Sequence, residues 1–449
     1  MSTRPNVLFF FTDDQRFDTL HALGNPHIHT PHLDRIAARG TVFTHAHIMG
    51  GSCPAVCMPS RAMLHSGRTL FHIEGQGQGI PTTHTTLGEC LQQAGYTTFG
   101  TGKWHNGPAS YARSFTHGDR IFFGGMSDHF EVPLNPFDPT GQYPKDRIYH
   151  ESKRHSSDLF SNAVIDFLQH HDATDNPFFA YLSFTAPHDP RDTHPKFHAM
   201  YDPDKLPTPE NFLPEHPFDN GELKIRDEML APFPRTPEVI RKHLADYYAM
   251  ISHIDAAIGR VLATLDATGQ TDNTILVFAG DNGLAVGRHG LMGKQNVYDH
   301  SVHVPLMFAG PGVPRGETRD AFAYLLDIFP TLCDLTATPI TDSVEGHSLC
   351  PALACCSEPV RDTLFFAYRH FQRGIRDRRH KLIEYNVDGA RTTQLFDLVA
   401  DPFEMHDLAA ASSHAEPLAR LRAELARWQG ELDDPDEFGM QADGSLGHS

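Results

Sequence analysis

The chain has 449 residues, 40% of them hydrophobic, so it can bury a large core, and its length favours more than one domain. Its formal net charge of −19 argues against nucleic acid as a general partner, because binding to phosphates requires clustered Lys and Arg. That charge does not exclude a small anionic substrate held in a locally positive pocket. The seven cysteines are scattered and odd in number, so they predict no disulfide framework.

The N-terminal segment shows no targeting signal. Its first apolar run, residues 7–11, is too short for the core of a signal peptide or for a membrane span. We therefore expect a cytoplasmic protein with no membrane partner, although a chain trimmed of an export signal would look the same.

Apolar runs and helical patterns alternate along most of the chain. Strands are expected at residues 7–11, 96–99, 178–184, 275–278 and 304–308, and helices at residues 33–39, 87–94, 156–171 and 237–265. This alternation predicts an α/β fold in which a large, mostly parallel mixed sheet is sandwiched by helices. Residues 186–237 are rich in Pro and His and interrupt the pattern, so we expect them to form an ordered excursion at the mouth of a pocket.

The pattern changes after about residue 355. Short strands are expected at residues 363–368, 374–376, 381–385 and 394–397, followed by a helix at residues 418–428. We therefore predict a catalytic α/β domain over residues 1–355 and a smaller C-terminal α+β domain with an antiparallel sheet over residues 356–430. Residues 431–449 are polar and are expected to form a loose tail.

Polar side chains of the kind that catalysis uses follow four of the predicted strands. In chain order these side chains are Asp13 and Asp14, Lys103 and His105, His188, and Asp281 and Asn282. Ligands of such sheets bind beyond the carboxyl ends of the strands, so we expect the four strand ends to converge on one site.

Asp13, Asp14, Asp281 and Asn282 offer only oxygen ligands. Hard cations such as calcium or magnesium prefer such a set, whereas zinc or manganese sites usually include histidine. A turn or a helix cap is the alternative interpretation of the Asp-Asp and Asp-Asn-Gly strings.

The most informative string surrounds Cys57. Residues 57–61 read Cys-Met-Pro-Ser-Arg, which is C-x-P-S-R, and the stretch continues to Arg68. It resembles the signature of the formylglycine-dependent type I sulfatases of the alkaline phosphatase superfamily. Taken alone, Cys57 could also be a small buried thiol. Cys53 lacks a proline at the second following position and does not match the signature.

The resemblance covers roughly residues 5–410. It includes the Gly-Lys-Trp-His string at Lys103 and His105, Ala-Pro-His at His188, Gly-Lys-Gln at Lys294, and the late strings at residues 395–398 and 401–404. The main departure is Asn282, which stands where some members of the family have His.

The resemblance implies a sulfuric ester hydrolase. In this family the motif cysteine, here Cys57, is oxidised to formylglycine, an aldehyde whose hydrate is the nucleophile. A formylglycine-generating enzyme is then a partner during maturation. The family places calcium on residues that match Asp13, Asp14, Asp281 and Asn282, and one hydroxyl of the matured residue 57 completes the metal site. Magnesium or manganese are alternatives to calcium.

The same resemblance implies roles for the remaining site residues. Lys103 would neutralise the charge of the sulfate, and His105 would take a proton from the second hydroxyl after sulfur transfer. His188 and Lys294 would contact the sulfate and help to protonate the leaving oxygen. Arg61, one helical turn after Cys57, would steady the hydrate and the metal ligands.

The substrate is not named by the sequence. A sulfated sugar, choline sulfate, or an aryl or alkyl sulfate would each fit, and Arg369 and His370, beside Tyr368 in the second domain, could contact the substrate. A phosphonate monoester or phosphodiester hydrolase of the same superfamily is the first alternative, which Asn282 disfavours. A non-catalytic metal- or glycan-binding protein is the second. The oligomeric state stays open.

Overall fold

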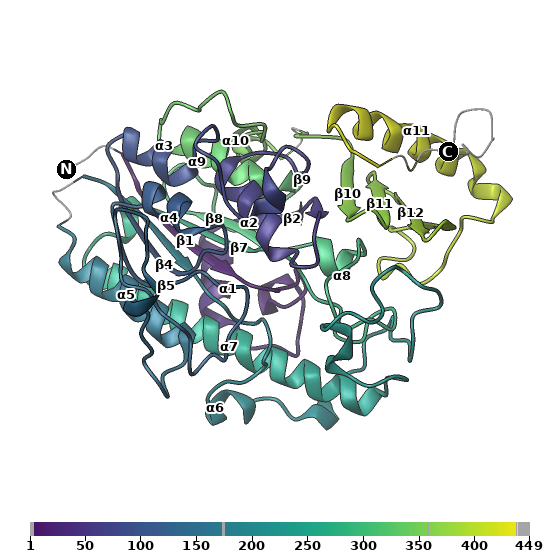
Figure 1. Ribbon diagram of the computed structural model, residues 1–449, viewed down its shortest axis with the longest axis horizontal. Coiled ribbons are helices and arrows are strands. Elements are labelled where there is room, and N and C mark those ends of the chain that lie inside the picture. Colours follow the sequence, from purple (N-terminus) through teal and green to yellow (C-terminus); the bar gives the residue numbers. More distant parts are fainter. Residues whose placement is uncertain (1–3, 173–175, 357–358, 437, 439–449) are drawn as a thin grey trace.

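The computed structural model describes residues 4–172, 176–356, 359–436 and 438, which form a large sheet covered by helices and a smaller sheet beside it (Figure 1). Both the predicted fold class and the antiparallel character of the smaller sheet are confirmed. No helix in these described ranges is both long enough and apolar enough to cross a membrane.

The large sheet has eight strands in the described part of the chain, in the order β5-β4-β6-β1-β7-β8-β2-β9. Their bounds are β1 Asn6–Thr12, β2 Gly40–His47, β4 Thr97–Lys103, β5 His117–Phe122, β6 Phe178–Ser183, β7 Thr274–Gly280, β8 Leu306–Ala309 and β9 Glu317–Tyr324. β8 runs antiparallel to both of its neighbours, while the other pairs are parallel, so the sheet is mixed. All five strands expected from apolar runs, in β1, β4, β6, β7 and β8, are present.

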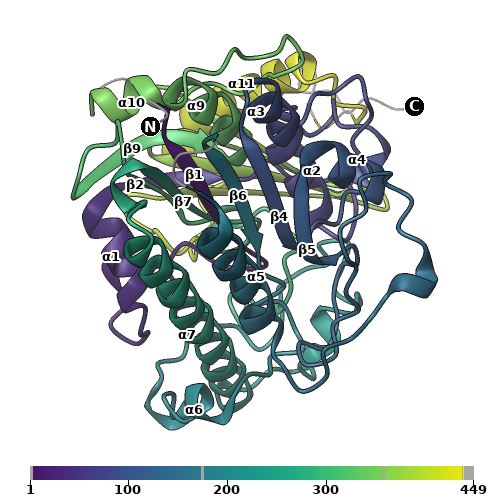
Figure 2. The ribbon, with the colours of Figure 1, turned by 90° about the vertical axis from the view of Figure 1, so that its left-hand side faces the viewer.

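Helices cover both faces of this sheet (Figure 2). The α-helices are α1 Pro31–Arg39, α2 Cys57–Ser66, α3 Leu87–Gln93, α4 Pro108–Ser114, α5 Ser156–His170, α6 Pro195–His198, α7 Pro237–Ala267, α8 Asp299–Val302, α9 Ile328–Leu335, α10 Cys350–Ala354 and α11 Ala415–Glu431. The five helices expected from the sequence are α1, α3, α5, α7 and, in the C-terminal part, α11.

The residues of β1 alternate between two hydrophobic cores, because successive side chains of a strand point to opposite faces. Phe9 and Phe11 pack in the core that includes α2, α3 and α9. Leu8 and Phe10 pack in the core that includes α1, α5 and α7. Each fully buried Leu or Phe contributes roughly 1.5–3 kcal/mol, so the double-sided burial fixes the position of β1 at the centre of the sheet.

The smaller sheet has the order β13-β12-β11-β10-β3. Its strands are β3 Gly50–Gly51, β10 Leu364–Tyr368, β11 Gln372–Arg376, β12 His380–Val387 and β13 Ala390–Asp397. β3 pairs in parallel with β10, and a Cβ at Gly50 would lie 2.0 Å from the carbonyl oxygen of Ala367. This glycine lets the segment just before Cys57 form the edge of the C-terminal sheet.

The division at residue 355 stays a prediction, since β3 joins the two sheets. The expected tail lies largely outside the described residues. In its described part, Asp434 and Asp436 pair with the buried Arg373, so this stretch is tied to the smaller sheet.

Candidate active site

The predicted convergence of strand ends occurs at the carboxyl edge of the large sheet. β4, β6, β1 and β7 lie side by side, so the residues that follow them share one edge (Figure 2). Direct contacts join three of these ends: Lys103 Nζ lies 2.5 Å from Asp13 Oδ2, and the backbone N–H of Asp14 donates to Asp281 Oδ1 at 2.9 Å.

Cys57 is the first residue of α2 and is 2% exposed. Its Sγ lies 3.4 Å from Lys103 Nζ and 3.4 Å from His105 Nδ1. Burial raises the pKa of the Cys57 thiol to about 11 despite the nearby lysines. The unmodified thiol is therefore protonated at neutral pH and is a poor nucleophile, although cationic groups surround it.

Arg61 connects α2 to three strands of the sheet. Its Nε donates to Asp281 Oδ2 at 2.9 Å, and its Nη1 donates to Ser183 Oγ at 2.6 Å and to the carbonyl oxygen of Lys103 at 3.1 Å. Arg61 and Asp281 are both fully buried. These contacts fit the expectation that Arg61 steadies the carboxylate ligands and the start of α2.

Asp14 is held in an unusual backbone conformation with φ 67°, in the left-handed region that costs a non-glycine residue free energy. Its Oδ1 accepts hydrogen bonds from Asn282 Nδ2 at 2.8 Å and from Lys294 Nζ at 2.5 Å. The buried side chains of Asn282 and Lys294 therefore orient this carboxylate into the site.

The donor set fits a hard divalent cation. Among the described residues, the buried oxygens Asp13 Oδ1 and Asn282 Oδ1 have no hydrogen-bond partner. Single ligand atoms of Asp13, Cys57 and Asp281 lie within 4.8 Å of one another. Burial and the charge of Asp13 raise the pKa of Asp281 to about 7. A cation at this point would satisfy the free oxygens and offset the repulsion between carboxylates.

Two histidines face the same site. His188 Nδ1 donates to the carbonyl oxygen of Asp189 at 2.8 Å, and its Nε2 lies 3.7 Å from Asp14 Oδ2. Burial and the charges of Lys103 and Arg61 lower the pKa of His105 to about 2. His105 is therefore a neutral proton acceptor, and His188 presents its Nε2 to the carboxylates.

The two predicted substrate contacts are placed differently. Arg369 Nη1 lies 2.5 Å from Glu222 Oε1, and its side chain is 31% exposed. Burial raises the pKa of the Cys53 thiol, and the charges of Arg369 and Lys294 partly oppose that shift. Arg369 therefore lies at the rim of the site. His370 instead packs on Phe371 and lines a separate cavity, and its predicted role stays untested.

Sequence reasoning missed several residues that position the site. Ser183 binds Arg61, Glu222 binds both Arg369 and the Tyr368 hydroxyl, and Asp189 pairs with Arg226 beside His188. Glu222 and Asp189 lie in the irregular excursion, where no periodicity marks them. Of these residues, only Ser183 could have been found from local sequence pattern, because it ends the apolar run of β6.

Fold and site together place a buried cysteine beside a set of oxygen ligands that suits a divalent cation. The family model for sulfatases matches residues 5–338, and the model described as N-sulphoglucosamine sulphohydrolase, C-terminal, matches residues 287–431. The chain is 26% identical to an N-acetylglucosamine-6-O-sulfatase of Bacteroides thetaiotaomicron, over 97% of this chain and 88% of that protein.

Two solved structures have the same fold. One is a protein in complex with its substrate D-glucosamine-2-N,6-O-disulfate, with a TM-score of 0.82 and 24% identity over 98% of this chain and 100% of that one. The other is the phosphonate monoester hydrolase of Agrobacterium radiobacter, with a TM-score of 0.75 and 23% identity over 96% of each chain.

The chain belongs to the sulfatase family, within the alkaline phosphatase superfamily. It is an enzyme, a hydrolase of sulfate esters.

Proposed function

We propose that Cys57, once oxidised to formylglycine by a formylglycine-generating enzyme, is the nucleophile for hydrolysis of a sulfate ester. The observation that carries this proposal is the contrast at Cys57 itself. The thiol has a pKa of about 11, yet Lys103 Nζ and His105 Nδ1 both lie 3.4 Å from its sulfur. A cationic, proton-accepting environment suits an aldehyde hydrate better than a protonated thiol.

In the first step one hydroxyl of the residue-57 hydrate would release its proton to solvent and attack sulfur, and the bond from sulfur to the leaving oxygen would break. Lys103 and Lys294, both buried, would neutralise the sulfate oxygens. His188 would donate a proton from Nε2 to the leaving oxygen, while the carbonyl of Asp189 holds its Nδ1.

In the second step His105 accepts the proton of the remaining hydroxyl. The carbonyl of residue 57 re-forms, its bond to the sulfate oxygen breaks, and sulfate leaves without water attacking sulfur. The negative charge of bound sulfate would raise the basicity of His105 over that of the free site.

Asp13, Asp14, Asp281 and Asn282 would hold calcium, with magnesium or manganese as alternatives, and the ion would supply positive charge to the sulfate and to the attacking hydroxyl. Asp13 Oδ1 and Asn282 Oδ1 support this assignment, because both oxygens are buried and accept no hydrogen bond from any described residue. Asp13 keeps a pKa well below its usual range, because Lys103 and other cations outweigh its burial, so it is ready to bind a metal ion.

A sulfated sugar is the substrate class that we favour, since the relative from Bacteroides thetaiotaomicron is named for a sulfated amino sugar. At the rim, Arg369 and Glu222 offer a cation and an acceptor that suit sugar hydroxyls and a second anionic group. Choline sulfate and aryl or alkyl sulfates remain in the test panel.

The experiment has two parts. Mass spectrometry of the peptide around Cys57, after co-expression with a formylglycine-generating enzyme, should show the aldehyde or its hydrate. The matured protein is then assayed against sulfated sugars, choline sulfate and an aryl sulfate. Turnover by protein that carries only the unmodified thiol would contradict the proposal.

Phosphonate monoester or phosphodiester hydrolysis is the second candidate function. The fold match to a phosphonate monoester hydrolase favours it, whereas the amide ligand Asn282 in place of His disfavours it. Parallel assays with phosphate monoester, phosphodiester and phosphonate ester substrates decide between the two functions.

A further inference from the structure

A second cluster of metal-binding side chains lies away from the catalytic edge. It joins Asp158 in the first turn of α5, His194 at the residue before α6, and His253 in α7. Figure 2 shows α5 beside α7, with α6 near the lower end of α7. The three side chains come from segments that are 36 or more residues apart, so tertiary structure alone brings them together.

Both imidazoles point their Nε2 atoms at the same oxygen. His194 Nε2 lies 2.9 Å from Asp158 Oδ2, and His253 Nε2 lies 3.2 Å from it. Zinc bonds to nitrogen and carboxylate oxygen are about 2.0–2.2 Å long, so a tetrahedral site separates neighbouring ligand atoms by about 3.3 Å. The observed separations of the ligand atoms are close to this distance, so a small movement of the side chains would make room for the ion.

The surrounding contacts orient these ligands. Thr193 Oγ1 lies 2.7 Å from His253 Nδ1, and Arg260 donates to Asp158 Oδ1 at 2.8 Å, on the oxygen that faces away from the histidines. The Thr193 hydroxyl can accept a hydrogen bond from Nδ1 when Nε2 binds an ion, and a bonded carboxylate oxygen favours one-oxygen coordination. Phe197 also stacks on His253, with ring centroids 4.5 Å apart.

The three proposed ligands differ in their exposure to solvent. The side chain of His253 is 2% exposed, whereas those of Asp158 and His194 are 30% and 33% exposed. An ion can therefore enter from solvent, and its fourth coordination position stays open to a water molecule.

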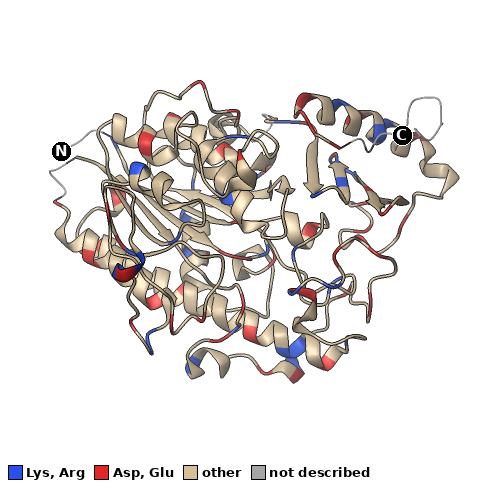
Figure 3. Ribbon diagram, in the orientation of Figure 1, with Lys and Arg blue, Asp and Glu red and all other residues tan. Residues whose placement is uncertain are grey.

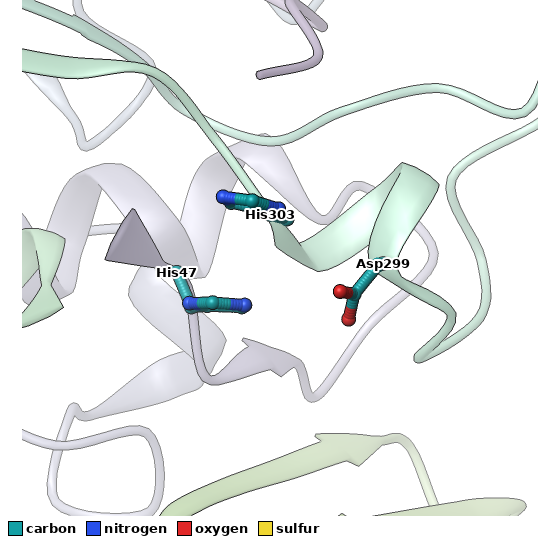
Figure 4. Close-up of side chains that lie close together, drawn as sticks. All are labelled: His47, Asp299 and His303. Atoms are coloured by element: carbon teal, nitrogen blue, oxygen red, sulfur yellow. The ribbon is translucent and has the colours of Figure 1, made fainter. Parts of the chain in front are cut away.

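A comparable cluster elsewhere does not have these properties. His47, Asp299 and His303 gather at one point (Figure 4). There, however, Arg376 Nη1 lies 3.2 Å from His47 Nε2 and 3.1 Å from Asp299 Oδ2, and Lys381 Nζ lies 2.6 Å from Asp299 Oδ1. Both carboxylate oxygens are bound by fixed cations, so no position is left for a metal ion.

We propose that Asp158, His194 and His253 form a structural zinc site with water as the fourth ligand. Zinc replaces the two hydrogen bonds to Asp158 Oδ2 with bonds to the Nε2 lone pairs. Each imidazole then carries its proton on Nδ1 instead of Nε2, toward Thr193 in His253 and toward solvent in the partly exposed His194. The ion ties the segment between β6 and α6, which also carries His188, to α5 and α7.

The test measures zinc binding and unfolding, not catalysis. Metal-stripped full-length protein is equilibrated with zinc chloride, desalted and analysed for metal content, and its unfolding temperature is recorded with and without zinc. His194→Ala and Asp158→Asn should each bind one equivalent less than the wild type and show a smaller zinc-dependent rise in unfolding temperature. Zinc held at the catalytic carboxylates is common to all variants and cancels in the comparison.

His198→Ala is the matched control, because His198 is 31% exposed in α6, four residues after His194, but pairs with Asp246 and Asp192. It should behave like the wild type. Cobalt(II) should give the intense visible absorption of tetrahedral coordination in the wild type and not in His194→Ala. Equal zinc content in all four proteins, or equal loss in His194→Ala and His198→Ala, would overturn the proposal. A metal-free unfolding temperature close to wild type confirms that the variants fold.

Discussion

Lys103 Nζ lies 2.5 Å from Asp13 Oδ2, and both side chains are fully buried. The pair joins the ends of β4 and β1 and holds the pKa of Asp13 well below its usual range against its burial. The ammonium group also lies 3.4 Å from Cys57 Sγ, so one lysine keeps the proposed metal ligand Asp13 ionised and places positive charge beside the proposed nucleophilic position.

Lys103→Met should remove turnover and lower the free energy of unfolding of the metal-free protein by about 3–5 kcal/mol, because it leaves the Asp13 carboxylate buried without its partner. Urea denaturation at neutral pH measures this loss. Lys205→Met is the control: Lys205 is 82% exposed in its pair with Asp202, so its loss should cost less than about 1 kcal/mol. Equal stability of the two variants would contradict the assigned role of Lys103.

Cys57→Ser should trap the first half of the reaction. A single hydroxyl can accept the sulfate group but has no second hydroxyl to expel it. Intact-protein mass spectrometry after incubation with substrate should show a stable sulfate ester on the introduced serine. Cys57→Ala should keep the fold and show neither the ester nor turnover. Repeated turnovers by the serine variant at the wild-type rate would rule out the hydrate mechanism.

His105→Ala should slow the breakdown of the sulfated enzyme more than its formation. Rapid mixing with an aryl sulfate should then give a burst of released alcohol, stoichiometric with matured enzyme, before a steady state slowed by about 10²–10⁴-fold. His188→Ala, the comparison variant, should lose the burst because it affects departure of the alcohol. If His105→Ala also lacks the burst, His105 acts in the earlier step.

Calcium affinity should rise with pH between about 5 and 7. Burial and the charge of Asp13 raise the pKa of Asp281 to about 7, so a proton must leave before the metal binds. In the metal-free protein a raised pKa means that the folded state holds this proton above the usual carboxyl pKa. The contribution of Asp281 to the free energy of unfolding therefore falls as pH rises from about 4 to about 7.

Calorimetric titration with calcium across this pH range checks the predicted affinity. Urea denaturation of the metal-free protein over the same range checks the predicted free energy of unfolding. Asp281→Asn should flatten both dependences and weaken binding at every pH. A calcium affinity that stays constant from pH 5 to 7 in the wild type would be inconsistent with this assignment.

The ligand set should prefer calcium or magnesium to zinc at the catalytic centre. Chelation should abolish activity, and calcium should restore it better than zinc does, because the set offers only carboxylate and amide oxygens. Asn282→His should shift the preference toward manganese or zinc by replacing an amide oxygen with an imidazole nitrogen. Activity that requires stoichiometric zinc in the wild type would show that the ligand interpretation is wrong.

Several elements could be predicted from local pattern alone. The apolar runs in β1, β4, β6, β7 and β8 identified these strands because a strand buried on both faces carries few polar residues. β9 and β5 were missed, because their sequences begin with exposed charged or polar residues at the sheet edges. β2 was missed because threonine and histidine residues interrupt its apolar ones. β3 has only two glycines and acquires its structure from its pairing with β10.

The sequence by itself predicted which chemical groups gather at the candidate active site. Asp13, Lys103, His188 and Asp281 each follow an apolar run, and a parallel sheet brings the ends of such runs to one edge. The C-x-P-S-R string likewise identified Cys57, since a short motif needs no knowledge of the remaining chain.

Only the tertiary structure decided the states and partners of these groups. The pKa of Asp281 depends on its burial and on the nearness of Asp13. The left-handed conformation of Asp14 depends on the contacts that hold it. The pairing of Arg369 with Glu222 joins residues that are 147 positions apart in the sequence. Burial and long-range electrostatics depend on distances in space, which local periodicity does not encode.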